Sequence, residues 1–170
     1  MEVSLRPASS ADGPAFLALV DSLADYEKLP RPTEDARTRL LADAFALSPP
    51  RFSLILAETK DSGVIGYAVT FETYSTFLAK PTLYLEDLFV HPDFRGIGAG
   101  GALFDAVAVE ALRRGCGRME WSCLNWNELA WKFYERRGAE HLEGWRMYRF
   151  TEENLQRLSD SRGAGGVNLP

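Results

Sequence analysis

The spacing of apolar residues changes several times along this chain, and each change predicts a new helix or strand. A short strand is expected from Val3 to Arg6. After it, Phe16, Leu19 and Leu23 recur every three or four residues, as they do on the buried face of a helix. A second helix is expected from Thr33 to Phe45, because prolines bound this stretch on both sides.

The middle of the chain is rich in residues that favour strands. The runs from Phe52 to Thr59 and from Val64 to Thr73 flank Asp61-Ser62-Gly63, a sequence typical of a hairpin turn. The next run, Leu83 to Val90, is apolar on both faces, as in a strand covered on both sides. We therefore expect a sheet with Leu83 to Val90 at its centre.

The second half of the chain continues the alternation of helices and strands. A helix is expected from Ala99 to Arg114, and Gly115 is expected to end it. Its buried face is expected to contain Leu103, Phe104, Val107 and Ala111. The other expected elements are a strand from Arg118 to Leu124, a helix from Asn127 to Arg137 and a last strand from Trp145 to Phe150.

Composition bounds the class of protein. The chain has 170 residues, of which 46% are hydrophobic, and this suits one globular domain with a full core. We expect that domain over residues 1–158, followed by a disordered tail from Ser159 to Pro170, which is rich in glycine and serine. The net charge of −5 argues against general nucleic-acid binding and favours a cationic small substrate.

Metal and membrane functions find little support in the sequence. Cys116 and Cys123 are too few and wrongly spaced for a zinc site or a disulfide framework, and His91 and His141 are unpaired. No leader opens the chain, and no apolar run reaches the roughly 18 residues that a membrane span needs. We therefore expect a soluble cytoplasmic protein without a metal.

The most informative stretch runs from Arg95 to Gly101, where a glycine-rich loop joins the central strand to an amphipathic helix. Glycines let backbone N–H groups approach a ligand, and the N-terminus of a helix favours a phosphate. Arg95 adds a fixed positive charge. A nucleoside triphosphate is disfavoured, because Ala102 and Leu103 stand where such loops need lysine and then serine or threonine.

A dinucleotide is the second phosphate ligand to consider. Gly96, Gly98 and Gly101 satisfy the spacing GxGxxG, and Glu120 lies at about the distance expected for a ribose-binding acid. In dinucleotide-binding folds, however, the strand runs almost directly into the first glycine and the motif opens the domain. Here His91 to Arg95 intervene, and the motif lies past the midpoint of the chain.

The spacing Arg95-x-x-Gly98-x-Gly100 after a strand resembles the acetyl-CoA signature of the GCN5-related N-acetyltransferase (GNAT) family. A second block at family spacing consists of Asn127, Ala130, Tyr134 and Gly138. Three stretches are similar to the diamine (spermidine/spermine) acetyltransferase branch and its thialysine-acetylating relatives. They are Leu83 to Val90, Trp126 to Glu128 with Phe133 to Ala139, and Glu143 to Arg146. The resemblance runs from about Val3 to about Leu158.

This resemblance implies a fold, a cofactor and an assembly. The fold is a mixed, mostly antiparallel central sheet flanked by helices, with two splayed central strands between which acetyl-CoA lies. Relatives are commonly homodimers, so a homodimer is expected. The cofactor-contacting positions that the resemblance implies are Leu88, Phe89, Val90, Arg95, Gly96, Ile97, Gly98, Ala99, Gly100, Gly101, Asn127, Ala130, Tyr134 and Arg137.

Two side chains carry the chemistry that the resemblance implies. Glu86, expected to be a buried carboxylate beside the acyl site, takes a proton from the incoming ammonium, directly or through water, and Tyr134 protonates the departing thiolate of coenzyme A. From spacing alone, Tyr134 is a core aromatic and Arg137 a solvated residue at a helix end. Because side chains alternate along a strand, Glu86 and Asp87 are expected on opposite faces. Asp87 then either pairs with arginine or backbone donors, or orients the cationic substrate.

The acceptor side is less well defined. Positions that match the acceptor side of the diamine branch are Tyr26, Glu27, Glu86, Asp87, Glu120, Trp121 and Ser122. They provide an aromatic and anionic setting suited to an alkylammonium chain. The loop from Ser75 to Pro81 departs from the branch, since Phe77 stands where close relatives carry tryptophan, and this leaves spermidine or spermine open.

The sequence therefore predicts an acetyltransferase that transfers an acetyl group to a primary amine in a ternary complex. Other acceptors stay open, namely an amino acid side chain, an aminoglycoside-like amine or a protein lysine. The alternative from another class is a non-catalytic acyl-CoA-binding sensor. Glu86 and Tyr134 speak against a sensor, because binding alone needs neither.

Overall fold

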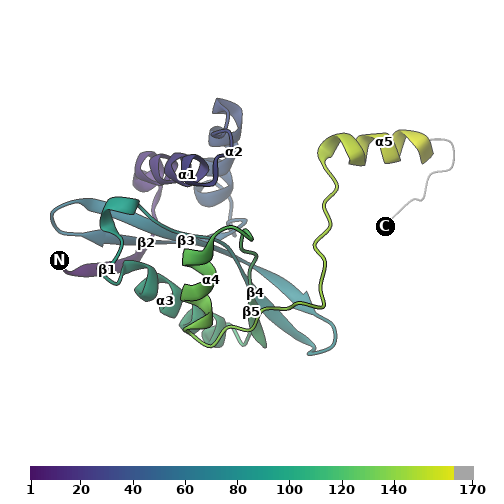
Figure 1. The fold of residues 1–170 in the computed structure, drawn as a ribbon. Coiled ribbons are helices and arrows are strands. Elements are labelled where there is room, and N and C mark those ends of the chain that lie inside the picture. Colours follow the sequence, from purple (N-terminus) through teal and green to yellow (C-terminus); the bar gives the residue numbers. More distant parts are fainter. Residues whose placement is uncertain (163–170) are drawn as a thin grey trace. The chain divides into compact units, whose positions relative to one another are not determined.

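The computed structural model describes residues 1–162, and the chain divides into two compact units between Ser122 and Cys123. The first unit contains the whole sheet and three α-helices, and the described part of the second unit, up to residue 162, contains two helices (Figure 1). Within residues 1–162, no helix is both long and apolar enough to cross a membrane.

Five strands of the first unit form one sheet, in which their spatial order is their order in the chain. They are β1 (Val3–Pro7), β2 (Ser53–Thr59), β3 (Gly63–Ser75), β4 (Lys80–Val90) and β5 (Arg118–Glu120). All neighbours pair antiparallel except β4 and β5, which are parallel. The expected mixed, mostly antiparallel sheet is confirmed.

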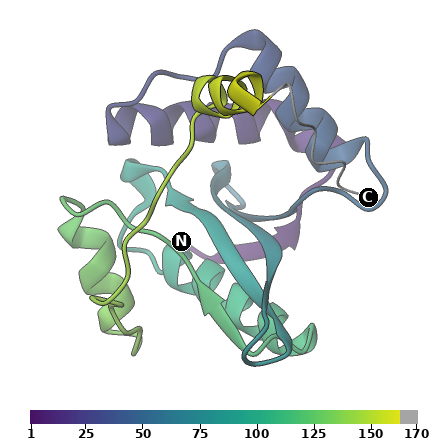
Figure 2. The ribbon, with the colours of Figure 1, turned by 90° about the vertical axis from the view of Figure 1, so that its right-hand side faces the viewer.

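Helices cover both faces of this sheet (Figures 1 and 2). On one face lie α1 (Gly13–Glu27) and α2 (Glu34–Phe45), and on the other lies α3 (Ala99–Arg113). We call these the α1 side and the α3 side. The α1-side core contains Phe16, Leu19, Leu54, Leu56, Tyr67, Val69 and Phe89. The α3-side core contains Ala57, Ile65, Ala68, Leu83, Leu85, Val90, Ala99, Leu103, Val107 and Ala111.

The expected helices of this unit form for the reasons given by their sequences. Thr33 caps α2, since its hydroxyl accepts a hydrogen bond from the backbone N–H of Ala36 at 3.3 Å. On α3, Leu103, Val107 and Ala111 are buried at intervals of one turn, and Phe104 packs against the same core. The short helices η1 (Ser10–Asp12) and η2 (Pro92–Phe94) complete the unit.

The strand β4 contains a β-bulge at Glu86. Asp87 pairs with Val69 and Leu85 pairs with Thr70, so Glu86 has no residue opposite it on β3. The extra residue reverses which positions face the α3 side. Before the bulge these are Leu83 and Leu85, and after it they are Leu88 and Val90.

The bulge corrects one expectation. Strict alternation predicted Glu86 and Asp87 on opposite faces, and this is wrong. Glu86 follows the alternation of the first half of β4 and Asp87 that of the second half, so both lie on the α1 side. Sequence alternation failed here because it assumes a regular strand.

The parallel ladder between β4 and β5 is short. It joins Thr82 to Arg118, Leu83 to Met119 and Tyr84 to Glu120, whereas β4 continues to Val90. In the described residues, β4 therefore has no strand partner on its β5 side from Leu85 to Val90. β4 and β5 thus pair only at one end, in keeping with the splayed strands that the resemblance implied. The strand expected from Arg118 to Leu124 ends at Glu120, where its ladder with β4 also ends.

The second unit, described by itself, differs from expectation near its C-terminal end. The helix α4 (Glu128–Glu135) forms, but the strand expected from Trp145 to Phe150 does not, because its backbone has no ladder partner among the described residues. The helix α5 (Glu152–Arg162) was not predicted, and it includes the first residues of the expected disordered tail. Residues 163–170 lie outside the described residues.

Candidate functional site

The glycine loop presents an open backbone at the start of α3. Gly96 and Gly98 have φ values of +83° and +93°, a region that other residues rarely adopt. A Cβ atom at either position would meet nothing within 4 Å, so this face of the loop is open. Gly98 is the N-cap of α3, and its carbonyl accepts from the N–H of Ala102 at 3.0 Å. Free N–H groups of the first helical turn can therefore bind an anion here.

Arg95 is held between this loop and the end of α1. Its Nε donates a hydrogen bond to the carbonyl of Val90 at 3.1 Å. Its guanidinium lies over the ring of Tyr26, 4.5 Å from the ring centroid, and 5.8 Å from the centroid of Phe89. The structure thus brings together one residue predicted to contact the cofactor and one predicted to contact the acceptor.

Next to this stack, the bulge of β4 places two carboxylates on the α1 side. Glu86 is exposed, which corrects the expectation of a buried carboxylate at this position, and Asp87 is half-buried. The hydroxyl of Tyr67 donates to Oδ2 of Asp87 at 3.4 Å. Glu86 lost its expected burial because it is the extra residue of the bulge, which bends the strand locally.

Burial and charge change the proton affinities of this acidic group. Burial raises the pKa of Asp87 to about 6, and the negative charges of Glu86 and Glu27 add to that rise. The hydrogen bond from Tyr67 acts in the opposite direction, because it stabilises the carboxylate form. Burial also raises the pKa of Glu27 at the end of α1. The site therefore holds a carboxylate whose pKa is closer to neutrality than that of an ordinary aspartate.

Tyr67 was not among the residues predicted from the sequence. It is fully buried on β3, where it packs edge-on against Phe16 with ring centroids 5.1 Å apart. Burial and the nearby carboxylates raise its pKa well above the usual range, so its hydroxyl stays protonated. The only sequence signal was a tyrosine inside an apolar strand, since a buried hydroxyl needs a partner.

The three predicted site residues near the end of β5 make different contacts. The hydroxyl of Ser122 lies 2.9 Å from that of Tyr84. Glu120 pairs with Arg118 at 3.0 Å. Trp121 packs edge-on against Phe104 of α3, with ring centroids 5.4 Å apart, so its ring belongs to the α3 side. The structure does not bring Trp121 together with Asp87.

Within the second unit, α4 has the local structure that its sequence predicts. Asn127 is the N-cap, and its Oδ1 accepts from the backbone N–H of Ala130 at 3.3 Å. Tyr134 is half-buried and packs edge-on against Phe133, with ring centroids 5.2 Å apart. The guanidinium of Arg137 lies over the ring of Phe133 at 4.3 Å. Gly138 follows at a φ of +84°.

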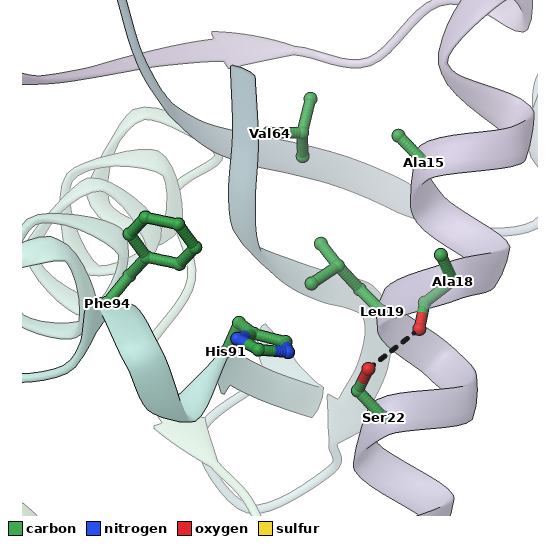
Figure 3. Close-up of a pocket in the computed structure, with 7 residues that line it drawn as sticks. All are labelled: Ala15, Ala18, Leu19, Ser22, Val64, His91 and Phe94. Carbon is green, nitrogen blue, oxygen red and sulfur yellow. Dashed lines mark hydrogen bonds between the residues drawn. The ribbon is translucent and has the colours of Figure 1, made fainter. Parts of the chain in front are cut away.

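A small pocket of about 260 Å³ lies elsewhere in the first unit, between α1 and the end of β4 (Figure 3). Its lining contains Ala15, Ala18, Leu19, Ser22, Val64, His91 and Phe94. None of these is a predicted site residue, and the Ser22 hydroxyl already donates to the carbonyl of Ala18 at 2.9 Å. The one imidazole in its lining is that of His91, whose Nδ1 accepts a hydrogen bond from the backbone N–H of Asp93 at 3.4 Å. No cluster of three or more potential metal ligands occurs in residues 1–162.

Comparison with known proteins shows which family this chain belongs to. Residues 16–139 match the acetyltransferase (GNAT) family. The chain is 34% identical over 166 residues to thialysine N-epsilon-acetyltransferase of Bos taurus, which covers 92% of this chain and 97% of that protein. It is 32% identical over 160 residues to spermidine/spermine N(1)-acetyltransferase-like protein 1 of Homo sapiens, which covers 89% of this chain and 23% of that longer protein.

A solved structure has the same fold. An integron cassette protein from the mobile metagenome of V. cholerae is similar with a TM-score of 0.79 at 24% identity, covering 94% of this chain and 98% of that chain. The resemblance recognised in the sequence is confirmed, since the matched region includes the whole of β4, the glycine loop and α4. The chain therefore belongs to the acetyltransferase (GNAT) family and is an N-acetyltransferase of the GNAT type, with relatives named for thialysine and for spermidine and spermine.

Proposed function

We propose that this enzyme transfers the acetyl group of acetyl-CoA directly to a primary amine of a small cationic substrate in a ternary complex. The acceptor class is a diamine, a polyamine or a lysine-like amine. The observation that carries this proposal is the order of features along β4. The carboxylates Glu86 and Asp87 lie near the start of the strand edge that has no β5 partner in the described residues, Leu88 to Val90 follow on that edge, and the glycine loop comes next. In this order, the carboxylates would bind an ammonium group, the strand edge would bind the thioester arm, and the glycine loop would bind a phosphate.

Acetyl-CoA would bind along the edge of β4 that has no β5 partner in the described residues, and at the glycine loop. From Leu88 to Val90, β4 has no β5 partner in the described residues, so its backbone groups on that side could bind the thioester arm, except the Val90 carbonyl, which accepts from Arg95. The N–H groups of the loop and of the first turn of α3 would hold the pyrophosphate. In the second unit, the cofactor contacts in this proposal are Asn127, Ala130, Tyr134 and Arg137.

The chemistry follows from the proton transfers that amide formation needs. The acceptor arrives as an alkylammonium with a pKa of about 10.4, so it must lose a proton before its nitrogen can attack the thioester carbonyl. The carboxylates on the α1 side would receive that proton. The N–H of Leu88 would donate to the carbonyl oxygen, and the hydroxyl of Tyr134 would protonate the departing sulfur.

The acceptor class is supported by charge and by the names of the relatives. Glu27, Glu86 and Asp87 give the α1 side of β4 an anionic character, with Tyr26 beside them. Thialysine and spermidine, which appear in the relatives' names, both carry alkylammonium groups. The loop from Ser75 to Pro81 differs from the diamine branch, so lysine-like amines stay within the proposal beside the polyamines.

A homodimer is also part of the proposal. In the second unit, Trp145, Met147, Tyr148 and Phe150 are exposed, with 60% to 83% of their surface accessible. Monomeric proteins rarely expose so many large apolar side chains together, and a second copy would cover them. Light scattering on the purified chain should give twice the monomer mass, and a monomer mass would contradict this part of the proposal.

The experiment that tests the function is an amine panel with acetyl-CoA, in which released thiol is measured. Diamines, polyamines, lysine-like amines, an aminoglycoside and a lysine peptide would be compared by kcat/KM. We expect thiol release with the small cationic amines. Acetyl-CoA should also raise the melting temperature by mass action, whereas NADH and ATP should not. Acetyl-CoA binding without thiol release for any amine would indicate the sensor instead.

A first prediction concerns the stack of Arg95 on Tyr26. Replacing Tyr26 by leucine is expected to raise the KM for acetyl-CoA by about 3- to 10-fold, because a cation–π contact contributes about 0.5 to 2 kcal/mol. Tyr26→Phe keeps the ring and should leave that KM unchanged. Steady-state kinetics with acetyl-CoA as the varied substrate measure both. A change confined to the KM of the amine would show that Arg95 does not depend on this ring.

A further inference from the structure

Tyr67 is a buried polar side chain that the reaction described above does not use. Its ring is fixed between Phe16 and Phe89, with centroids 5.1 and 6.2 Å away, and no part of the residue is exposed. This packing directs the hydroxyl to Oδ2 of Asp87, at 3.4 Å. Among the described residues, no other side chain or backbone group donates a hydrogen bond to that carboxylate. The protein core thus holds one donor against one carboxylate.

The two carboxylates of the bulge differ in their surroundings. Glu86 is exposed to solvent, while Asp87 is half-buried against β3. An exposed carboxylate is strongly hydrated and loses that hydration when it accepts a proton. A half-buried carboxylate has already lost much of it on folding, and is therefore the better proton acceptor.

We propose that Asp87 takes the proton from the acceptor ammonium and that Tyr67 is a positioning residue, which orients this carboxylate and tunes its basicity. This inference rests on the proposed function and deepens it. It transfers the role that the sequence predicted for Glu86 to the neighbouring residue. Glu86 and Glu27 then attract the positive charge of the substrate without accepting its proton.

The proton step balances without any further reagent. One N–H bond of the ammonium breaks and one O–H bond to Asp87 forms, which leaves a lone pair on the nitrogen for attack on the thioester carbonyl. Tyr67 keeps its own proton, because its pKa lies far above neutrality. After the product leaves, Asp87 returns the proton to water. The positive charge of the ammonium is lost at the same moment as the negative charge of Asp87.

The groups that face Asp87 set the expected pH dependence. Glu86 on β4 and Glu27 on α1 raise its pKa, as does burial, and the hydroxyl of Tyr67 on β3 lowers it; the resulting pKa is about 6. Below this pH the group is protonated and cannot accept a proton, so kcat/KM should fall as the pH drops through about 6.

The first test is the pH profile of Tyr67→Phe. This change keeps the ring and removes the donor, so the pKa of Asp87 should rise and the acid limb of kcat/KM should move upward by about 0.5 to 1 pH unit. At pH values above the acid limbs of both proteins, kcat/KM of Tyr67→Phe should stay within about twofold of wild type, because the protonated fraction of Asp87 is small there. A matched control is Tyr74→Phe, which removes the hydroxyl of a 64% exposed tyrosine on the same strand and should move nothing.

Stability and activity must be separated in this test. If Tyr67→Phe lowers the melting temperature but leaves the acid limb in place, Tyr67 is an ordinary core tyrosine and the inference is overturned. Carboxyl carbon NMR of the resting enzyme gives a second readout that needs no turnover. The Asp87 signal should titrate at a higher pH in Tyr67→Phe than in wild type, and an unchanged midpoint also overturns the inference.

The second test compares the two carboxylates directly. Asp87→Asn should lower kcat/KM by about 10²-fold or more and abolish the acid limb, as expected for loss of a general base. Glu86→Gln should keep the acid limb, moved to lower pH because a negative charge beside Asp87 is lost, and should mainly raise the KM of the amine. The reverse pattern, in which Glu86→Gln abolishes the limb, would return the base to Glu86. Wild type that releases no thiol with any amine would instead reject the proposed function itself.

Discussion

The Tyr134→Phe variant is expected to lose about 10- to 10³-fold in kcat, while its KM for acetyl-CoA stays within about twofold. The change deletes a single oxygen and keeps the ring that packs against Phe133. Coenzyme affinity should hardly change, because the sulfur develops negative charge only in the transition state. Steady-state kinetics with a good amine and a thermal melt of each protein measure this outcome.

The control for this variant lies in the same unit. Tyr148 is 83% exposed, so Tyr148→Phe removes a phenol hydroxyl without touching α4 and should leave kcat unchanged. If Tyr134→Phe turns over like wild type, the hydroxyl does not protonate the leaving group. If stability and acetyl-CoA binding are lost together, Tyr134 is a core residue. A sensor would release no thiol in wild type or mutant, and both would still bind acetyl-CoA.

Replacing Gly98 by valine is expected to weaken acetyl-CoA binding by at least about 100-fold, which corresponds to a loss of ~3 kcal/mol. At a φ of +93°, a Cβ atom is strained, and its side chain would occupy the open face of the loop where the pyrophosphate is proposed to lie. Calorimetric titration with acetyl-CoA measures the change. Binding that remains within a few-fold of wild type would remove this loop from the cofactor site.

Strain alone must not be mistaken for loss of the site, and the chain offers a matched control. Gly63, the first residue of β3 after the hairpin turn, also has a positive φ of +67°, and a Cβ atom there would also meet nothing within 4 Å. Gly63→Val should therefore cost a similar amount of stability, about 1 to 2 kcal/mol, and leave acetyl-CoA binding intact. Equal losses of binding in both variants would point to general destabilisation.

Local patterns in the sequence were sufficient for much of the fold. The buried positions of α3 recur at one-turn spacing, and the hairpin between β2 and β3 carries a clear turn sequence, so both were predicted where they occur. The glycine loop was equally readable, because positive φ angles at Gly96 and Gly98 are a property of the residue type. These features depend on residues close together in the chain.

Features that depend on distant residues were predicted less well. The bulge at Glu86 arises from the pairing of β4 with β3, and no residue type near Glu86 indicates that this strand contains an extra residue. The hydrogen bond between Tyr67 and Asp87 depends on that same pairing. The segment from Trp145 to Phe150 has strand-forming residues, yet a strand also needs a neighbour, and composition cannot supply one.

The stack of Arg95 on Tyr26 has a consequence for how such an enzyme changes its acceptor during evolution. Tyr26 belongs to the last turn of α1 and was predicted on the acceptor side, yet its ring supports the arginine of the phosphate loop. A mutation of Tyr26 that changes the amine preference would therefore also change the binding of the acetyl donor through Arg95. We expect acceptor preference to diversify more freely at Glu27 or in the loop from Ser75 to Pro81, because Arg95 is held by Tyr26 and Val90 and not by these residues.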